Sequence, residues 1–262
     1  MEIIEIFDTS LLNSTLRMIT PILLAALGGL LCTRAGVFNI ALEGLMLTGA
    51  FTAVVGSFFL QSSFAGVMAG VLGGMLMAAL FGLLAVRLSG NMIALGVALN
   101  FLAMGLTTFL SRAVFGVKGV FSDPRILGLN PITIPVIDEI PILGSVFSGH
   151  SSVVYLSWLL VIISYIMLFH HPSGLRLRGV GEKPQASATL GVNVKATKFI
   201  AVILSGALCG LAGAQLSLGQ VTLFVENMSA GRGWIAVVAV MFGQAHPLGV
   251  FGASALFGFF DA

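Results

Sequence analysis

The chain has 262 residues, of which 58% are hydrophobic and only 8% are charged; roughly 25% of the residues in a soluble domain are charged. So few charges cannot cover a surface that faces water, whereas a helix that spans a bilayer needs only about 20 apolar residues. Composition therefore excludes a soluble fold and predicts an all-α, polytopic membrane helix bundle. The acidic N-terminus lacks the Lys/Arg-rich start and the cleavage site of a signal peptide.

Apolar runs between charges and turn residues predict the membrane segments. Six runs are read as spans, near residues 18–31, 41–59, 64–86, 92–110, 152–169 and 199–218. The first is short and is expected to borrow residues at its ends. Two further runs, Trp234 to Gly243 and Val250 to Phe260, are too short to cross about 30 Å at about 1.5 Å per residue. They are either half-helices or spans that recruit their neighbours, and the total is about eight membrane segments.

Two connections are long enough to have structure of their own. Residues 111–150 contain Pro124, Pro131, Pro135 and Pro141, which predict an irregular, partly rigid cap. Residues 171–198 contain a short helix signal. Pro184 suits a first helical turn, residues 185–190 can continue it, and Gly191 can end it.

The charges separate when the six spans alternate in direction. One side carries seven basic residues and one acidic residue, Glu182, a net charge of +6; the basic residues are Arg34, Arg87, Arg176, Arg178, Lys183, Lys195 and Lys198. The other side carries five basic and seven acidic residues, a net charge of −2. By the positive-inside rule the first side is cytoplasmic. Residues 171–198 then form a cytoplasmic loop, residues 111–150 an extracytoplasmic loop, and the N-terminus lies outside.

Polar residues within apolar spans are the candidates for function, because an ionisable group there costs about 2.5 to 3.5 kcal/mol. Glu43 is the clearest case, and Asn39 lies four residues earlier, on the same face if the segment is helical. Glu43 could make an interhelical hydrogen bond, pair with Arg34 near the interface, or contact a substrate or gate. Asn91 and Asn100 at the fourth span suit either helix packing or a polar solute.

The segment from Gln220 to Trp234 interrupts the apolar pattern with Glu226, Asn227 and glycines. Irregular backbone at membrane depth is tolerated where protein or a water-filled cavity surrounds it. This segment is therefore either part of a pathway, or its outer gate, or an ordinary exterior loop.

Other chemistries have weak signals. Ser254 with His246 would suit an intramembrane serine hydrolase only if the serine had a nearby base. Cys32 and Cys209 match no metal or disulfide spacing, and neither a metal nor a cofactor is expected. No basic run with interleaved aromatics indicates nucleic acid, and no Walker-type phosphate loop is present, so ATP would have to be used by another chain. Glycine pairs at spacing four, such as Gly70 and Gly74 or Gly206 and Gly210, predict close helix packing.

Four stretches together resemble the permease subunits of ABC importers in the ribose, branched-chain amino acid and nucleoside group. They are GVFNIALEGLMLTGA at 36–50, GEKPQASATLGVN at 181–193, FIAVILSGALCGLAG at 199–213 and ENMSAGRGWIAVVAVMFG at 226–243. The resemblance covers most of residues 18–262. It is nearest to nucleoside permeases that work with a basic-membrane-protein-type lipoprotein. Members of the group usually continue past residue 262 with further apolar sequence, so this chain is expected to lack a final span.

The resemblance implies a type II-like importer permease in the cell membrane, which is a transport subunit and not an enzyme. Its implied partners are ABC ATPase subunits, a second permease subunit, an extracytoplasmic substrate-binding lipoprotein and the lipid bilayer. Residues 181–193 would hold the helix that docks on the ATPase, with coupling residues Gly181, Glu182, Pro184, Ala186, Ala188, Leu190 and Gly191. The expected pathway residues are Asn39, Glu43, Asn91, Asn100, Phe224, Glu226, Asn227 and Trp234. Alternatives are a permease of the same fold for a sugar or an amino acid, and an ion-coupled secondary transporter.

Overall fold

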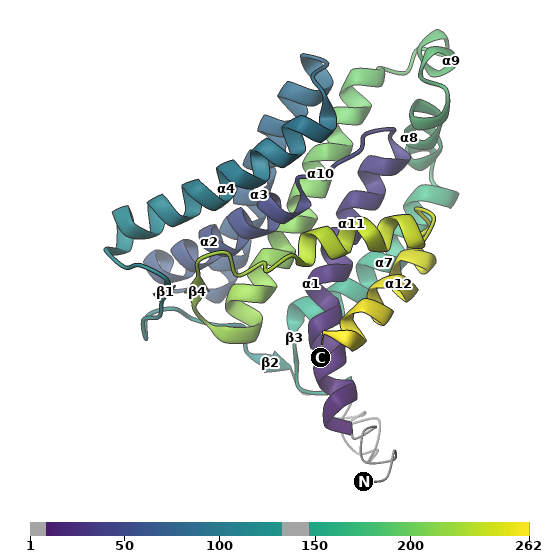
Figure 1. Cartoon of the computed structure of the whole chain (residues 1–262). Helices are drawn as coiled ribbons and strands as arrows, with labels where there is room; N and C mark the ends of the chain where they lie inside the picture. The colour runs from purple at the N-terminus through teal and green to yellow at the C-terminus, as the bar shows by residue number, and fades with distance from the viewer. Residues whose placement is uncertain (1–8, 133–146, 262) are drawn as a thin grey trace.

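The computed structural model describes residues 9–132 and 147–261. Its long helices are α1 (Thr9–Arg34), α2 (Leu42–Leu60), α3 (Ser63–Gly82), α4 (Met92–Phe115), α7 (Ser152–His170) and α10 (Val194–Ala214) (Figure 1). Single π-helical segments, Leu83–Arg87 and Gln215–Val221, extend α3 and α10. In this part of the chain six helices are long and apolar enough to span a membrane, which confirms the six predicted spans. The first span is longer at both ends than predicted and covers Leu11–Arg34.

Two short helices follow the last long span. They are α11 (Arg232–Phe242) and α12 (Pro247–Phe260), of 11 and 14 residues, or about 16 and 21 Å at 1.5 Å per residue. Both pack against α1. Arg232 at the start of α11 forms a 2.9 Å ion pair with Asp261 after the end of α12. The pair is thus a hairpin of half-helices, which is one of the two possibilities that the sequence left open.

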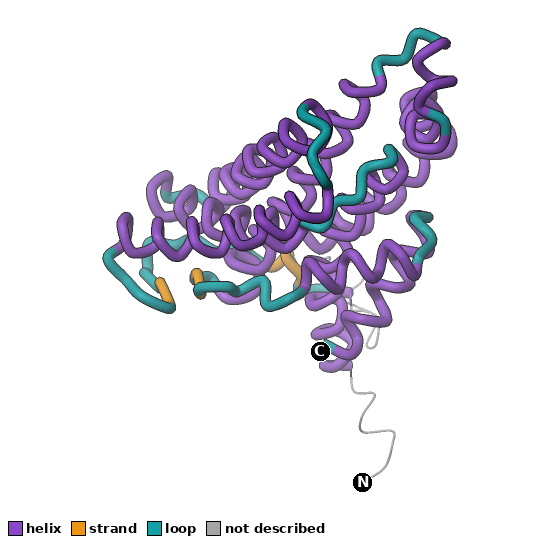
Figure 2. The backbone as a smooth tube through the Cα atoms, turned by 45° about the horizontal axis from the view of Figure 1, so that its top comes forward, coloured by secondary structure: helices purple, strands orange, loops and turns teal. Residues whose placement is uncertain are grey.

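Helix α10 lies at the centre of the bundle, against α1, α2 and α3 (Figure 1). Figure 2 shows that most of the described chain is helical and that the strands are short. Glycines make the packing of α10 possible. A Cβ atom on Gly210 of α10 would collide with the carbonyl oxygen of Gly70 in α3, and one on Gly74 with that of Gly206. The backbones of α3 and α10 therefore touch directly, as the glycine spacing predicted.

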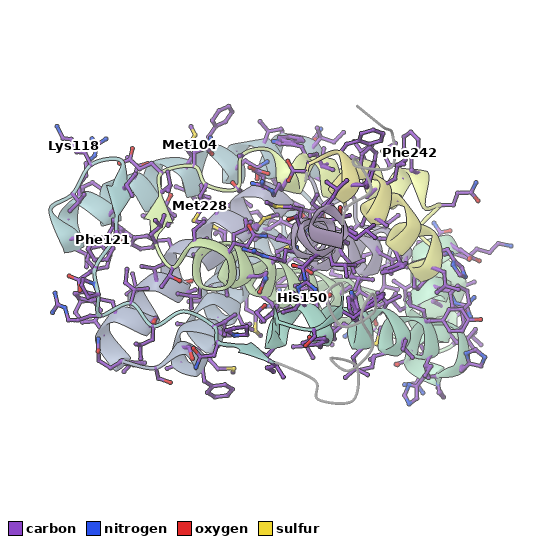
Figure 3. The ribbon with its side chains drawn as sticks, turned by 90° about the horizontal axis from the view of Figure 1, so that it is seen from below. Met104, Lys118, Phe121, His150, Met228 and Phe242 are labelled. Carbon is purple, nitrogen blue, oxygen red and sulfur yellow. The ribbon has the colours of Figure 1, made fainter. Side chains whose placement is uncertain are left out.

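Short antiparallel strands occur at one end of the bundle. The first pair joins β1 (Val120–Phe121) to β4 (Phe224–Val225), with Phe121 opposite Phe224, and the second joins β2 (Pro131–Ile132) to β3 (His150–Ser151). A cluster of phenylalanine rings supports the first pair, with Phe115 stacked on Phe121 at 3.8 Å between ring centroids. Figure 3 looks onto this end and shows Lys118 and Phe121 at the far side of the molecule from Phe242.

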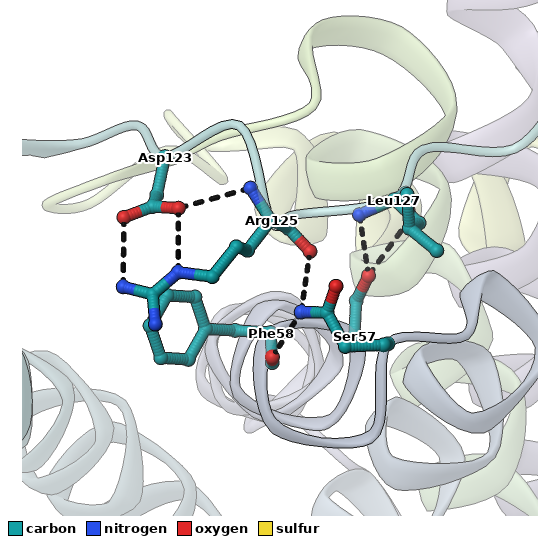
Figure 4. Close-up of polar contacts among 6 residues, drawn as sticks. Ser57, Phe58, Asp123, Arg125 and Leu127 are labelled. Carbon is teal, nitrogen blue, oxygen red and sulfur yellow. Dashed lines mark hydrogen bonds and ion pairs between the residues drawn. The ribbon is translucent and has the colours of Figure 1, made fainter.

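The described part of the 111–150 connection is fastened to the end of α2 (Figure 4). The Ser57 hydroxyl both accepts from the Leu127 N–H and donates to the Leu127 carbonyl, each at 2.9 Å. Arg125 pairs with Asp123, and its guanidinium lies 4.2 Å from the ring centroid of Phe58. Hydrogen bonds from Arg125, chiefly from its side chain, hold the pKa of Asp123 below its ordinary value. This stretch is irregular but held in place, whereas Pro135 and Pro141 lie outside the described residues.

At the opposite end, residues 171–198 are mostly helical. The predicted short helix is present as α9 (Pro184–Thr189), and Gly191 after it has a φ of +81°. A second helix, α8 (Pro172–Glu182), was not expected. It begins with Pro172 in its first turn, and the His171 ring nitrogen accepts the Ser173 N–H at 3.3 Å. The structure thus adds a second helix to the one that the sequence predicts in this segment.

Candidate functional site

Glu43 lies in the first turn of α2 and is only 8% exposed. Its two carboxylate oxygens accept the backbone N–H groups of Gly231 at 2.8 Å and Gly233 at 2.7 Å. These groups belong to the start of α11, where Gly231 has a φ of +86°. The first N–H groups of a helix have no partner within it, and this end of the helix dipole is positive, so it favours an anion. Glu43 therefore connects α2 to α11 by interhelical hydrogen bonds.

Arg34 is not the hydrogen-bonding partner of Glu43. Its Nε donates instead to the carbonyl oxygen of Ala245, at 2.6 Å, in the turn between α11 and α12. Its guanidinium carbon also lies 5.8 Å from the ring centroid of Phe169 in α7. Arg34 thus fixes the far end of α11 against the end of α1.

Two asparagines stabilise the non-helical segment that leads into α2. The Asn100 amide of α4 donates to the Ile40 carbonyl at 3.0 Å and accepts the Gly44 N–H at 2.8 Å. Asn39 accepts the Ala41 N–H at 3.0 Å and donates to the Ser205 hydroxyl at 3.3 Å. Backbone groups at membrane depth need such partners because lipid offers none. Both side chains therefore stabilise the backbone at the start of α2.

A cavity of about 230 Å³ opens beside Glu43. The residues that line it include Glu43, Asn100, Phe101, Met104, Asn227 and Trp234. Phe101 and Trp234 are 65% and 43% exposed, so the wall that they form is open. Two aromatic rings next to amide groups can hold a flat, polar solute by stacking and hydrogen bonding.

A second cavity, of about 370 Å³, shares the helices α2 and α11 with the first. Its walls include Asn39, Leu42, Val237, Val240 and Gln244. Because the Glu43 carboxylate joins these two helices, it fixes the spacing of the walls of both cavities.

The structure brings together four of the predicted pathway residues, Glu43, Asn100, Asn227 and Trp234, and places Asn39 in the neighbouring cavity. The other three line neither cavity. Asn91 caps the start of α4 by accepting the Ile93 and Ala94 N–H groups, at 3.0 and 3.1 Å. Phe224 is 1% exposed and packs against Phe51, with ring centroids 5.2 Å apart. Glu226 accepts the Gly119 N–H at 3.2 Å and lies 3.6 Å from Arg112.

Sequence reasoning missed several parts of the site. Phe101 and Met104 line the first cavity but look like ordinary apolar residues of a span. The donors of Gly231 and Gly233 are backbone groups, which carry no side-chain signal. The glycines on either side of Arg232, just before a short apolar run, were the available clue to an exposed helix start.

The predicted coupling residues lie in and next to α8 and α9. Gly181 packs against the turn between α1 and α2, where a Cβ atom on it would collide with the Arg34 carbonyl. A Cβ atom on Gly36 would in turn lie 3.1 Å from the Gly181 Cα. Farther out, Leu190 is 84% exposed after the end of α9. Glu182, Ala186, Ala188 and Gly191 are exposed as well, and Pro184 is partly buried.

Ser254 and His246 do not form a hydrolase pair. The Ser254 hydroxyl is buried and has no hydrogen-bond partner in the part of the chain that the structure describes. The His246 ring packs instead against Phe169, with ring centroids 5.1 Å apart.

A bundle of six candidate spans and two half-helices, with an open cavity beside Glu43, is the arrangement expected of a membrane permease. The fold is similar to that of a solved ABC transporter provisionally assigned to the metal-chelate type, in an inward-facing conformation. The TM-score is 0.51 at 17% sequence identity, and the match covers 93% of this chain and 72% of the other.

Residues 11–262 match the family described as the permease component of the branched-chain amino acid transport system, and the chain belongs to that family. It is 37% identical over 268 residues to the guanosine ABC transporter permease NupQ of Bacillus subtilis, covering 99% of this chain and 82% of the relative. It is 35% identical over 250 residues to the nucleoside permease NupC of Lactococcus lactis, covering 93% and 78%. A permease provisionally assigned to a glucose transporter, TsgC13 of Haloferax volcanii, is 38% identical over 265 residues, covering 98% and 77%.

These matches make the chain a multi-pass membrane permease of an ABC importer. It is a transport subunit and not an enzyme, and it works with ATPase and substrate-binding partners.

Proposed function

We propose that this permease carries nucleosides across the membrane. The observation that carries the proposal is that two relatives, matched over nearly the whole chain at 37% and 35% identity, are named as guanosine and nucleoside permeases. The first cavity agrees in chemistry, because Trp234 and Phe101 can stack on a nucleobase while Asn227 offers hydrogen bonds to it. TsgC13 favours a second candidate, a sugar permease, and the family description a third, for branched-chain amino acids.

In this proposal the solute passes Asn227 and Trp234, while Glu43 and Asn100 hold the wall and Asn39 lines the next part of the route. Phe224 and Glu226 form the outer gate, because they fasten β4 to β1 next to the cavity residue Asn227. Asn91 contributes by fixing the start of α4. A second permease subunit completes the open wall at Phe101 and Trp234.

The proposed coupling route begins at α9, where the ATPase subunits dock on the cytoplasmic 171–198 region around the exposed Leu190. Movement passes through α8 to Gly181, which touches the turn at Gly36. That turn leads directly to Asn39 and Glu43. The N-terminus and the 111–150 loop then lie outside, where an extracytoplasmic substrate-binding lipoprotein docks.

Uptake by the complete complex in proteoliposomes tests the substrate. We expect ATP-dependent uptake of labelled guanosine that excess glucose and leucine do not reduce. Uptake of glucose or leucine in place of guanosine would contradict the nucleoside assignment. Uptake driven by an ion gradient without the ATPase subunits would contradict the ATP-driven mechanism.

Trp234→Ala tests the cavity, with Trp158→Ala as the matched control. Trp158 lies in α7 and contacts Phe147 and Tyr155, away from the cavity lining. Loss of a stacked base costs about 1 to 3 kcal/mol, so Trp234→Ala should weaken nucleoside transport by roughly 5- to 150-fold, while Trp158→Ala should not. Equal uptake by both variants would remove Trp234 from the pathway.

A further inference from the structure

A basic cavity lies at the start of α10, away from the proposed pathway. Its volume is about 450 Å³, and the residues that line it include Arg87, Lys195, Phe199 and Ile200. An adjoining cavity of about 290 Å³ is lined by Lys195 and Lys198 among others. Figure 1 shows the start of α10 and the connection from α3 to α4 at the same end of the bundle. We call Arg87, Lys195 and Lys198, with the two cavities, the basic site.

The positive charges of the basic site have no carboxylate partner among the described residues. The ion pairs that the described residues form lie elsewhere in the chain, and they join Arg112 to Glu226, Arg125 to Asp123 and Arg232 to Asp261.

The contacts that the basic site does make supply no negative charge. The Arg87 guanidinium carbon lies 5.2 Å from the ring centroid of Phe199, and Lys198 donates to the Gly36 carbonyl at 3.5 Å. Neither cavity is lined by an acidic residue. Arg87 and Lys195 are exposed and Lys198 is half-buried. Because none of the three has a carboxylate partner among the described residues, the site is suited to an anion that approaches from outside the chain.

Apolar side chains next to the basic site decide which kind of anion fits. Ile200 forms part of the cavity wall and is 57% exposed. Leu88, directly after Arg87, is 69% exposed, and Leu83, one π-helical turn earlier, is 43% exposed. A free phosphate would gain nothing from this surface, whereas acyl chains would cover it. The anion is therefore expected to carry a hydrocarbon tail.

We infer that Arg87, Lys195 and Lys198 bind the phosphate of an anionic phospholipid, whose acyl chains lie along Leu83, Leu88 and Ile200. Basic pockets between spans at the membrane surface recognise such head groups, at about 1 kcal/mol for each Lys or Arg. Because Lys198 also holds the Gly36 carbonyl, the lipid lies next to the contact between Gly36 and Gly181. The inference does not depend on which solute is transported.

Native mass spectrometry of the full-length chain in its complex tests the inference, with phosphatidylglycerol and phosphatidylcholine as probes. We expect wild type to retain phosphatidylglycerol in preference to phosphatidylcholine. Arg87→Gln/Lys195→Gln should lower the affinity for phosphatidylglycerol by roughly 30-fold, about fivefold for each charge removed. The control is Arg176→Gln, an exposed arginine of α8 that lines neither cavity; its retention should equal that of wild type.

The charge-preserving variant Arg87→Lys/Lys195→Arg separates charge from folding, because it should retain the lipid even if the neutral variant is unstable. Equal retention of phosphatidylglycerol by the neutral variant, or equal retention of phosphatidylcholine by wild type, would overturn the inference. Excess inorganic phosphate distinguishes the two sources of a phosphate. Displacement of the lipid by it would show a site for free phosphate and overturn the lipid assignment, and undiminished retention would support it.

Discussion

Glu43 joins α2 to α11 in the interior of the permease. It is an almost fully buried carboxylate whose two oxygens are both used by backbone N–H groups of α11. A carboxylate in this position lies at the positive end of a helix and accepts hydrogen bonds from N–H groups for which lipid offers no acceptor. We therefore propose that Glu43 contributes to transport by positioning α11 and, with it, Trp234.

Replacing Glu43 should destabilise the protein. In Glu43→Gln the amide group opposes one of the two N–H donors, and an unsatisfied buried donor costs about 1 to 3 kcal/mol. We expect a lower unfolding temperature in detergent and a matching loss of uptake. Glu182→Gln is the control for the unfolding temperature alone, because this exposed carboxylate forms no ion pair among the described residues. An unchanged unfolding temperature for Glu43→Gln would contradict the proposed role.

The sequence identified Glu43, Asn39 and Asn100 because polar residues within apolar runs are visible without a structure. It could not identify what they bind. Their partners include the Gly231 N–H, the Ala41 N–H and the Ile40 carbonyl, and any residue carries such groups. The composition of this segment predicts a pathway role for Phe224 and Glu226 but does not reveal that they attach β4 to β1.

Among the elements, α3 and α10 show how tightly the bundle is built. Their contact depends on glycines, since a Cβ atom on Gly210 has no room next to Gly70. Gly210→Ala should therefore destabilise the protein by about 1 to 3 kcal/mol, the usual cost of overpacking. Gly105→Ala in α4 is the matched control, because nothing lies within 4 Å of its Cβ position. Thermal unfolding in detergent should separate the two, and similar unfolding temperatures would contradict the close contact.

Helix α9 is the element proposed to meet the ATPase. Leu190→Ser should uncouple the complex, lowering substrate-stimulated ATP hydrolysis and uptake together while the unfolding temperature stays the same. The physical reason is that Leu190 is 84% exposed in this chain and offers an apolar side chain to a partner. Leu127→Ser is the control, a leucine that is 42% exposed at the opposite end of the bundle. Full coupling in Leu190→Ser would place the docking surface elsewhere.

Long spans were predictable because each one is a continuous apolar run. Helix α8 was not, because its sequence, PSGLRLRGVGE, carries three charges and three glycines in 11 residues and looks like a loop. Pro172 alone suits a first helical turn but does not distinguish a helix from a loop. The pairing of Val120–Phe121 with Phe224–Val225 was also out of reach, since two-residue strands far apart in sequence have no pattern that links them.

For the whole molecule, the distribution of charge predicts its orientation in the membrane. The native Cys32 and Cys209 are fully buried and should not react with a membrane-impermeant maleimide. Lys118→Cys should be labelled on intact cells, whereas Lys183→Cys should be labelled only after the cells are permeabilised, because both positions are exposed but at opposite ends. The reverse pattern would contradict an outside N-terminus.

Helix α11 is held at both ends by residues that flank one short stretch of chain. Arg34 binds the carbonyl just beyond its C-terminal end, and Glu43 binds its first N–H groups. The two residues flank the α1–α2 connection that Gly181 touches. A displacement of this connection would move the two ends of α11 together, so that the helix moves as a rigid body and does not bend. One small displacement at the membrane surface would then reshape both cavities at once.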